Sequence, residues 1–350
     1  MAYTIIDDPS AFFQTTLYTG TGSSLVVTNG GNSDLQPDLV WLKPRGITEG
    51  HFLTDSVRGV RQTIRSYRAN AEETESQGLT AFSSDGFTMG TNSDINTDDE
   101  PGVAWQWKAG TSFTNDASST SIGSIDSAGS ASDASGFSIV SYTGTGSAGT
   151  IKHGLSSAPK MIIAKDRDSG SLSWFVGHAS IGFTKRLKLD GTNNAADNTV
   201  WNNTSPTSSV FSVGSSANAN TSGNAIIAYC FADIKGYSKM GSYIGNGNVD
   251  GTFVYTGFRP AFFMIKNITS DSTNWHIYDN KRLGYNVDNN MSRANLNNAD
   301  QTDDDLDILS NGFKLRRVTS ALSTSGDTYI YMCFAEAPFV TSTGVPATAR

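Results

Sequence analysis

The chain has few cysteines and few charged residues, and each shortage excludes a class of protein. Its 350 residues include only two cysteines, Cys230 and Cys333, with no Cys-x-x-Cys pair and no Cys/His cluster. Neither a disulfide framework nor a cysteine-rich zinc site is therefore expected. Only 17% of the residues are charged, and the net charge of -8 comes without a basic patch, so we expect no nucleic-acid partner.

Long apolar runs and helical periodicity are also missing. No stretch approaches the roughly 18 apolar residues that a membrane-spanning helix needs. Residues 1–15 show no basic segment followed by an apolar run, so no signal peptide is predicted. One short helix is expected at residues 55–70. We expect a protein without a membrane partner, made in a cytoplasm, that leaves the cell by lysis or as part of a particle.

Glycine, small polar residues and aromatic residues are abundant. The chain has 35 Gly, 18 Phe, 12 Tyr and 6 Trp, and much of the remainder is Ser, Thr and Asn. This composition is typical of turn-rich β proteins, and the aromatic residues are enough for several small cores. The fold class predicted is all-β.

A threefold internal repeat is the main signal in the sequence. Each copy has four landmarks in one order: an aromatic residue with spaced glycines, a proline six residues before a lysine, a Ser-x-x-Phe element and a closing apolar strand. The spacing from lysine to phenylalanine is 44, 46 and 47 residues, and from there to the closing aromatic residue it is 20, 20 and 21. The first landmarks are Tyr18-Thr-Gly-Thr-Gly22, Tyr142-Thr-Gly-Thr-Gly146 and Tyr243-Ile-Gly-Asn-Gly247, the lysines are Lys43, Lys165 and Lys266, and the phenylalanines are Phe87, Phe211 and Phe313.

The residues around these landmarks favour strands. Phe137-Ser-Ile-Val-Ser-Tyr142 alternates apolar and polar residues, as a strand with one buried face does. Leu39-Val-Trp-Leu42 and Met161-Ile-Ile-Ala164 are short continuous apolar runs, which indicates burial on both faces. Such regular short strands predict three tandem sandwich-like modules, of jelly-roll or lectin-like type, each with its own core and packed together.

The repeat also sets the expected domain boundaries. Module 1 covers residues 1–110, module 2 covers residues 137–236, and module 3 with a C-terminal tail covers residues 237–350. The stretch between the first two, residues 111–136, is rich in Ser, Gly, Ala and Asp and has almost no apolar residues. Its composition predicts a linker or a long loop.

Several of these segments resemble a group of proteins encoded by tailed phages of marine and freshwater bacteria. The resemblance is carried by Met1-Ala-Tyr-Thr4, Pro37-Asp-Leu-Val-Trp-Leu-Lys43, Asp55-Ser-Val-Arg-Gly59, Gly136-Phe-Ser-Ile-Val-Ser-Tyr-Thr-Gly-Thr-Gly146, His153-Gly-Leu155, Tyr255-Thr-Gly-Phe-Arg-Pro260 and Val345-Pro-Ala-Thr-Ala-Arg350. It covers essentially the whole chain. Such proteins are usually described as virion structural, tail-fibre or uncharacterised proteins.

The resemblance implies a virion structural protein, assembled in the host cytoplasm and displayed on the particle. A tail-fibre or receptor-binding role comes first, and a capsid or tail decoration role is the alternative, because no heptads of a fibre shaft are visible. The expected partners are other virion proteins and a host surface glycan. A homotrimer remains open, because three internal copies could also mimic a trimer within one chain.

Two Asp/Arg pairs are candidate ligand-binding residues. Asp55-x-x-Arg58 recurs as Asp279-x-x-Arg282, in a motif that ends at Gly284. A carboxylate and a guanidinium on one turn could bind a sugar or a loop of a partner protein. They could also form an ion pair that holds a loop of the chain itself, which we favour for a repeated motif. The second copy has His178-Ala-Ser-Ile-Gly182 at this place instead.

Other candidates are weaker. Trp201 lies in a polar stretch and is the better candidate among the tryptophans for an exposed ring that stacks on a glycan. Asp94-Ile-Asn-Thr-Asp98-Asp99-Glu100 and Asp303-Asp-Asp-Leu-Asp307 have oxygen ligands but lack the calcium-loop pattern, so solvated turns are expected there and no metal. Cys230 and Cys333 occupy matching positions in closing strands, which predicts small core residues.

Catalysis has little support in the sequence. There is no Gly-x-Ser-x-Gly elbow, His-Glu-x-x-His motif or phosphate-binding loop, and the four histidines stand at unmatched repeat positions. We expect no enzyme, no catalytic residue and no cofactor. A glycan depolymerase is the second alternative, because paired carboxylates cannot be recognised by counting acids.

Overall fold

The protein is an all-β chain, as the composition predicts. The computed structural model describes residues 3–282, 286, 289–303 and 305–347. Strands make up 43% and helices 5%, which excludes a mixed α/β architecture. The helical elements are each a single turn: α1 (Ser93–Asn96), α2 (Ala117–Thr120), α3 (Ala217–Asn220) and the 3-10 turns η1 (Pro9–Ala11) and η2 (Ala179–Ile181).

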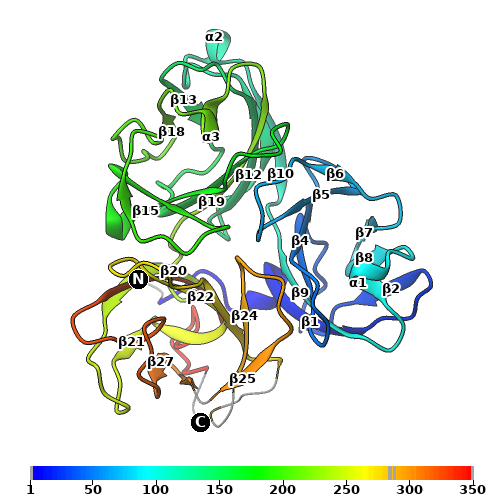
Figure 1. Cartoon of the computed structure of the whole chain (residues 1–350), viewed down its shortest axis with the longest axis vertical. Helices are drawn as coiled ribbons and strands as arrows, with labels where there is room; N and C mark the ends of the chain where they lie inside the picture. The colour runs from blue at the N-terminus through cyan, green and yellow to red at the C-terminus, as the bar shows by residue number, and fades with distance from the viewer. Residues whose placement is uncertain (1–2, 283–285, 287–288, 304, 348–350) are drawn as a thin grey trace.

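Three large antiparallel sheets form three lobes around a common centre (Figure 1). The first sheet has the order β1 (Phe13–Thr19), β9 (Pro101–Trp107), β3 (Leu39–Pro44), β4 (Phe52–Asp55), β5 (Gln62–Arg65), β6 (Glu73–Thr74). The second sheet has the order β10 (Thr111–Asn115), β11 (Ser127–Ser132), β12 (Phe137–Thr143), β19 (Ala225–Phe231), β14 (Met161–Asp166), β15 (Phe175–His178), β16 (Lys185–Lys188), β17 (Ala196–Asp197). The third sheet has the order β20 (Ser238–Ile244), β28 (Thr328–Pro338), β22 (Phe258–Asn267), β23 (His276–Asp279), β24 (Asn289–Arg293), β25 (Gln301–Asp303).

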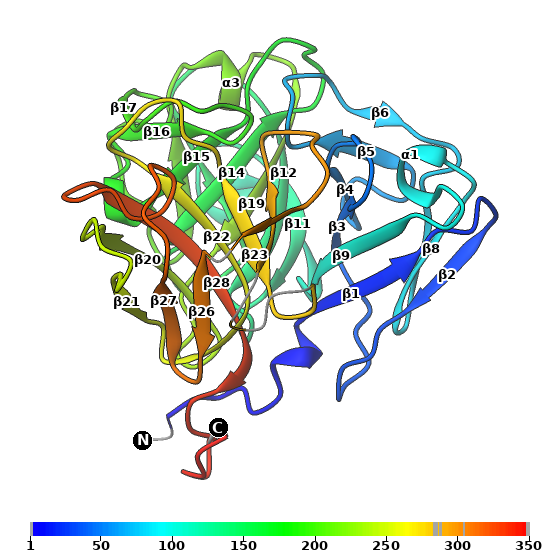
Figure 2. The same ribbon diagram turned by 60° about the horizontal axis from the view of Figure 1, so that its bottom comes forward.

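A small sheet accompanies each large one. These small sheets are β2 (Leu25–Thr28), β8 (Gly86–Met89) and β7 (Leu79–Ser83), then β13 (Gly149–Lys152) and β18 (Val210–Val213), then β21 (Phe253–Tyr255), β27 (Gly312–Leu315) and β26 (Leu306–Leu309). In Figure 2 the small strands β2 and β8 lie outside the first sheet, and β26 and β27 lie beside the third.

The closing apolar strand of each sequence copy lies inside its large sheet. β9, β19 and β28 each pair on one side with the strand that carries the Tyr/Gly landmark and on the other with the strand that ends near the landmark lysine. Cys230 and Cys333 lie in β19 and β28, are buried and form no disulfide. Both match the prediction of small core residues.

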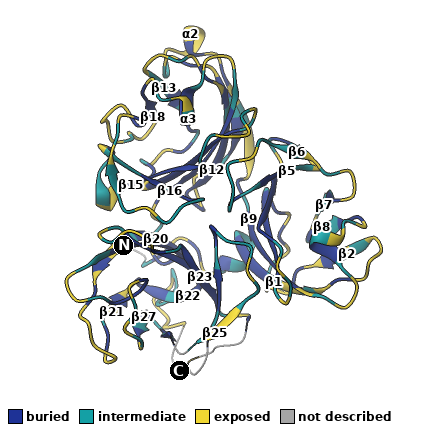
Figure 3. Cartoon of the chain, viewed as in Figure 1, coloured by how far each residue is buried: buried dark blue, intermediate teal, exposed yellow. Residues whose placement is uncertain are grey.

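Apolar residues of these strands alternate between two cores. In β3, Leu39 and Trp41 belong to a large central core, whereas Val40 and Leu42 pack on the far face with residues of β2 and β8. In β14 the same division separates Met161 and Ile163 from Ile162 and Ala164. The continuous apolar runs are therefore buried on both faces, as predicted. Figure 3 shows their neighbours β9 and β22 in the colour of buried residues.

The expectation of three separate cores is wrong in one respect. The first and second sheets each keep a local core, but the central core contains residues of all three sheets. At its end three closing-strand aromatic residues meet: the ring centroid of Phe334 lies 5.7 Å from that of Trp107 and 5.9 Å from that of Phe231. The local core of the third sheet is continuous with this cluster, because Phe263 and Phe313 belong to it.

Residues 111–136, predicted as a linker or loop, form strands instead. β10 and β11 extend the second sheet, with β11 paired to β12 from Ser127–Tyr142 to Ser132–Phe137. Small side chains suit this position, because a Cβ on Gly129 would lie 2.0 Å from the carbonyl oxygen of Ile139. Composition indicated flexibility, but the exposed edge of β12 provides the hydrogen bonds that order the segment.

The helix predicted at residues 55–70 is also absent. The Asp55 carboxylate accepts hydrogen bonds from the backbone N–H groups of Val57 and Arg58, at 3.1 and 2.9 Å, and this closes a turn. Strand β5 follows at Gln62–Arg65. An aspartate that binds the backbone two and three residues ahead favours a turn over a helix interior.

No helix in the described residues is both long and apolar enough to cross a membrane.

Candidate functional site

The first Asp/Arg pair lies at the contact between the first and second sheets. Both side chains are fully shielded from solvent, and Nε of Arg58 lies 2.5 Å from Oδ2 of Asp55. Tyr229 of the second sheet donates its hydroxyl hydrogen to the same carboxylate oxygen, at 2.7 Å. Arg58 also pairs with Glu72 at 2.9 Å, and Glu72 pairs with Arg167 at 2.6 Å.

The environment keeps Arg58 charged although it is buried. Burial alone would lower the pKa of the guanidinium, but the negative charges of Asp55 and Glu72 and the Tyr229 hydroxyl outweigh it and raise the pKa. A buried charge is tolerated only when it is paired and hydrogen-bonded in this way. The cluster is therefore a charged cross-link between two sheets.

The second Asp/Arg pair repeats this arrangement between the third and first sheets. Nε of Arg282 lies 2.7 Å from Oδ2 of Asp279, and both side chains are fully buried. The indole N–H of Trp105 donates to Asp279 at 2.9 Å. Arg282 pairs with Asp300 at 3.0 Å, and Asp300 pairs with Arg45 at 3.0 Å.

These positions favour the ion-pair interpretation over sugar binding. Asp55, Arg58, Asp279 and Arg282 have their hydrogen-bonding groups directed at one another and at the neighbouring sheet. A ligand in solvent could not reach any of these four side chains, because their exposed fraction is 0%. Gly284, which ends the second motif, lies outside the described residues.

The three landmark lysines are a structural feature whose role the sequence did not reveal. Lys43, Lys165 and Lys266 are completely buried. The ammonium group of Lys165 donates to the carbonyl oxygen of Ala69, at 3.0 Å, across to the first sheet's lobe, and Lys266 donates to that of Thr192, at 3.1 Å, in the second. Burial lowers the pKa of each lysine to about 8. The sequence did contain a signal for this burial, because a lysine ends the apolar run in every copy.

All four histidines are buried and held by backbone groups or neighbouring side chains. His51 contacts the carbonyl oxygen of Arg293 at 3.0 Å, and His178 contacts that of Tyr331 at 3.4 Å, so both lie at contacts between sheets. Burial lowers the pKa of His153 and His178 to about 4 and that of His276 to about 3, and the pKa of His51 lies well below its usual value for the same reason. Each imidazole is thus neutral at physiological pH.

Trp201 is not at the surface, so the expectation of an exposed stacking residue is wrong. Its exposed fraction is 0%, and it packs with Phe183, at a ring-centroid distance of 6.1 Å, and with Val200 in the local core of the second sheet. The polar residues around it form turns that bring the indole inward, which a count of neighbouring polar residues does not reveal.

Acidic residues in the stretch 94–100 bind neighbouring groups of the protein. Asp94 lies 3.4 Å from Arg65, and Glu100 accepts a hydrogen bond of 2.6 Å from the backbone N–H of Gly46. In the second acidic stretch, Asp303 and Asp305 both pair with Arg317, and Asp304 lies outside the described residues. Within the residues described, no three His, Cys, Asp or Glu side chains are placed to hold a metal ion.

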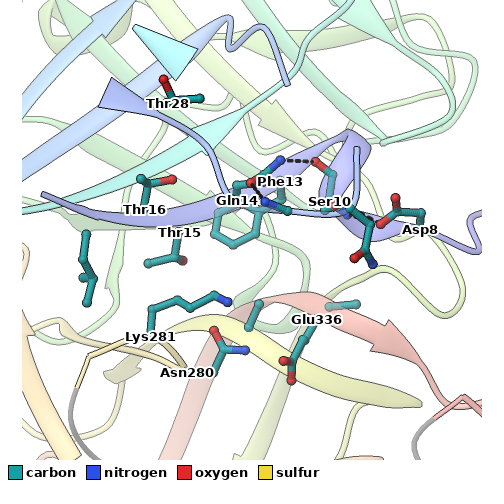
Figure 4. A pocket seen from close by; sticks show the side chains of 16 residues that line it. Asp8, Ser10, Phe13, Gln14, Thr15, Thr16, Thr28, Asn280, Lys281 and Glu336 are labelled. Atoms are coloured by element: carbon teal, nitrogen blue, oxygen red, sulfur yellow. Dashed lines mark hydrogen bonds between the residues drawn. The ribbon is translucent and has the colours of Figure 1, made fainter. Parts of the chain in front are cut away.

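A cleft at the junction of the first and third sheets is the candidate binding site. It encloses about 490 Å³, in the size range of small-ligand pockets, and it follows β1 from Phe13 to Leu17 on one side. We call it the β1 cleft. Figure 4 shows Asn280 and Lys281 across from Thr15 and Gln14, with Glu336 beside them.

Two polar atoms in the β1 cleft are buried without a hydrogen-bond partner. They are Oγ1 of Thr15 and Oδ1 of Asn280. The acidic side chains of the cleft are otherwise engaged, since Asp8 accepts from Ser10 and Ser33 and Glu336 pairs with Arg259 at 2.8 Å. Sequence reasoning missed this cleft, because its two walls are some 250 residues apart in the chain.

Comparison with protein families gives one match. The model of a domain of unknown function, DUF7483, matches residues 8–338, so the chain belongs to that family. Comparisons with curated proteins and with solved structures found no match.

Proposed function

We propose that this member of the DUF7483 family is a non-enzymatic structural protein of a phage particle, which displays binding loops for attachment to a host. The virion location rests on the resemblance described for the sequence. The display role rests on one structural observation: chemically versatile side chains are used to lock three sheets together. The two Asp/Arg clusters, Lys165 and Lys266, and His51 and His178 bind neighbouring sheets rather than facing solvent.

We further propose that the chain consists of three tandem sandwich-like modules, 1–110, 137–236 and 237–350, derived from one unit. Matching contacts support the proposal. The landmark tyrosines Tyr18, Tyr142 and Tyr243 each donate a hydroxyl hydrogen bond to a backbone carbonyl, at 2.9, 2.6 and 2.8 Å. The last landmark glycine has a positive φ in all three, with 62° at Gly22, 70° at Gly146 and 65° at Gly247.

A locked scaffold of this kind suits attachment. The connections between strands carry Asn, Ser and Thr at the periphery, where sequence change is tolerated, while the central core holds their positions. Many copies on a particle would turn weak contacts with a host surface glycan into useful avidity. The partners in this proposal are other virion proteins and that glycan, with a trimer of the chain as a further arrangement.

Immunogold electron microscopy of purified particles tests the location. We expect labelling at the tail or tail tip, and purified protein should compete with particles for adsorption to host cells. Labelling spread over the capsid in hundreds of copies would instead favour the decoration role. Absence from particles would contradict the virion proposal.

A second experiment tests the non-enzymatic role. Purified protein is incubated with host surface polysaccharide, and polymer length is followed by size-exclusion chromatography. We expect no shortening, and shortening would favour the depolymerase alternative over display.

A further inference from the structure

The open edge of β1 differs from the matching edges in the other two large sheets. β1, β12 and β20 take the same place, next to the closing strand. In an antiparallel pair, alternate residues direct both backbone groups toward the partner strand, and the residues between them direct both groups away. The hydrogen-bond partners of the outward N–H and carbonyl groups therefore show what covers each edge.

In the second sheet the edge is covered by another strand. The backbone N–H of Gly144 bonds to the carbonyl of Asn224, so even-numbered residues face β19 and Phe137, Ile139 and Ser141 face outward. β11, with the sequence Ser-Ala-Gly-Ser-Ala-Ser, pairs there. A Cβ on Gly129 would lie 2.0 Å from the carbonyl oxygen of Ile139, so this position of the covering strand needs glycine.

In the third sheet the edge is capped by neighbouring residues. The backbone N–H of Gly245 bonds to the carbonyl of Asp327, so Met240, Ser242 and Ile244 face outward. The N–H of Met240 donates to the Asp233 carboxylate at 2.7 Å, and the carbonyl of Ile244 accepts from Thr252 at 2.8 Å. These side chains take up groups that a strand would otherwise use.

In the first sheet, among the described residues, no second strand pairs with the edge and no side chain caps it, although Phe13 and Thr15 are only 2% and 7% exposed. The N–H of Lys108 bonds to the carbonyl of Phe12 and that of Gly20 to the carbonyl of Glu100, so Phe13, Thr15 and Leu17 face outward. Within the described residues no hydrogen bond takes up the outward N–H or carbonyl groups of these three residues. All three line the β1 cleft.

Two side-chain atoms of the cleft also lack hydrogen-bond partners. Thr15 is 7% exposed, and its hydroxyl oxygen has no hydrogen-bond partner. Oδ1 of Asn280, on the opposite wall, is likewise unpartnered. Lys281 contributes an ammonium group that forms no ion pair among the described residues, whereas both acidic groups of the cleft are engaged. Asn280 Oδ1 needs a donor, the Thr15 hydroxyl can donate or accept, and the outward groups of β1 include both N–H and carbonyl groups. The cleft therefore suits an extended peptide backbone, which offers both donors and acceptors, with an acidic side chain at Lys281.

We propose that the β1 cleft binds an extended peptide segment of a partner protein, which adds as a strand to the edge of β1. The segment has small side chains of the Ser, Ala and Gly type and an acidic residue that faces Lys281. Main-chain hydrogen bonds to an exposed edge supply affinity in such complexes, and the pockets beside the edge supply specificity. The proposal goes beyond the attachment role and does not depend on where the protein is located.

Calorimetric titration of the full chain with a synthetic peptide tests the proposal. The probe is Asp-Ser-Ala-Gly-Ser-Ala-Ser-Asp, the sequence of residues 126–133. We expect saturable binding and slower amide hydrogen exchange at Phe13, Thr15 and Leu17. Absence of saturable binding would overturn the proposal.

A pair of proline variants separates edge binding from other modes. Leu17→Pro removes an outward N–H that β9 does not use, so the fold is retained, while peptide affinity should fall roughly tenfold or more. Ser242→Pro, at an outward position of β20, is the matched control and should leave affinity unchanged. The unfolding temperatures of L17P and S242P are first shown to equal that of the wild type. Equal peptide affinity of the wild type and L17P would then contradict strand addition.

A second copy of the chain is the other possible occupant, and the same variants identify it. Sedimentation experiments show whether the chain dimerises as its concentration rises. If L17P abolishes such dimerisation and the peptide does not compete with it, the peptide proposal is overturned. Dimerisation that the peptide disrupts would support the cleft as a peptide site.

Discussion

The contacts between the large sheets occur in two chemical forms, and the difference follows from the residue on the opposite strand. In each large sheet one strand pairs with the strand of the landmark lysine on the side away from the closing strand. The last residue of that strand is Asp55 in β4, Asp279 in β23 and His178 in β15. The two aspartates meet hydrogen-bond donors, the hydroxyl of Tyr229 and the indole N–H of Trp105. His178 instead meets a backbone carbonyl, that of Tyr331.

The closing strands explain this choice. Trp105 and Tyr229 stand two residues before the final aromatic residue of β9 and β19, and Met332 stands there in β28. Methionine has no donor for a carboxylate. A buried aspartate opposite it would lose the hydrogen bond that Tyr229 and Trp105 supply and would keep an unsatisfied carboxylate oxygen. A neutral histidine avoids this cost, and among the described residues the contact between the second and third sheets has no counterpart of the Asp/Arg cross-link.

The largest expected effect comes from breaking a charged contact. Arg282→Met leaves Asp279 buried without its cation and leaves Asp300 paired with Arg45, and the free energy of unfolding should fall by about 3–5 kcal/mol. Chemical denaturation measures the loss. The double variant R282M/D279N should recover part of it, because it removes the stranded charge of Asp279. A loss below that of an ordinary surface substitution would contradict a buried cross-link.

Acid should weaken the contact that relies on His178. The pKa of His178 is about 4 in the folded chain and near 6.5 in the unfolded chain. Between these values the unfolded chain binds the proton and the folded chain does not, so stability falls as the pH falls. At about pH 5 the loss from one such histidine is about 2 kcal/mol.

Denaturation at a series of pH values measures this effect. His178→Asn should flatten the profile between pH 6.5 and 4 relative to wild type, since asparagine does not titrate. An unchanged slope would show that His178 does not titrate as the geometry implies.

The smallest expected effects concern the tyrosine hydroxyls that repeat in the three lobes. Tyr18→Phe, Tyr142→Phe and Tyr243→Phe each remove a hydroxyl bonded to a backbone carbonyl. Each should lower the free energy of unfolding by about 1 kcal/mol. Tyr255→Phe removes an exposed hydroxyl that bonds to the Tyr3 hydroxyl, at 3.2 Å, rather than to a buried carbonyl. It is the control and should change stability little. Unequal losses among the three would weaken the proposal that the lobes derive from one unit.

Much of the fold could be read from the sequence, because strand patterns are local. The period-2 alternation of β12 and the apolar runs of β3 and β14 are set by neighbouring residues, so they predicted strands and their burial. The same local reasoning failed at residues 111–136, where composition indicated a loop. Whether a Ser/Gly/Ala segment is ordered depends on a sheet edge supplied by another part of the chain.

By itself, the amino-acid sequence determined the all-β class, the landmark spacing, and the burial of Cys230 and Cys333 in closing strands. Only the tertiary structure decided that Asp55, Arg58, Asp279 and Arg282 join sheets, that Trp201 is buried, and that β1 has an open edge. The physical reason is that propensity and burial pattern depend on adjacent residues, whereas the partner of a buried charge or of a strand edge comes from a distant segment.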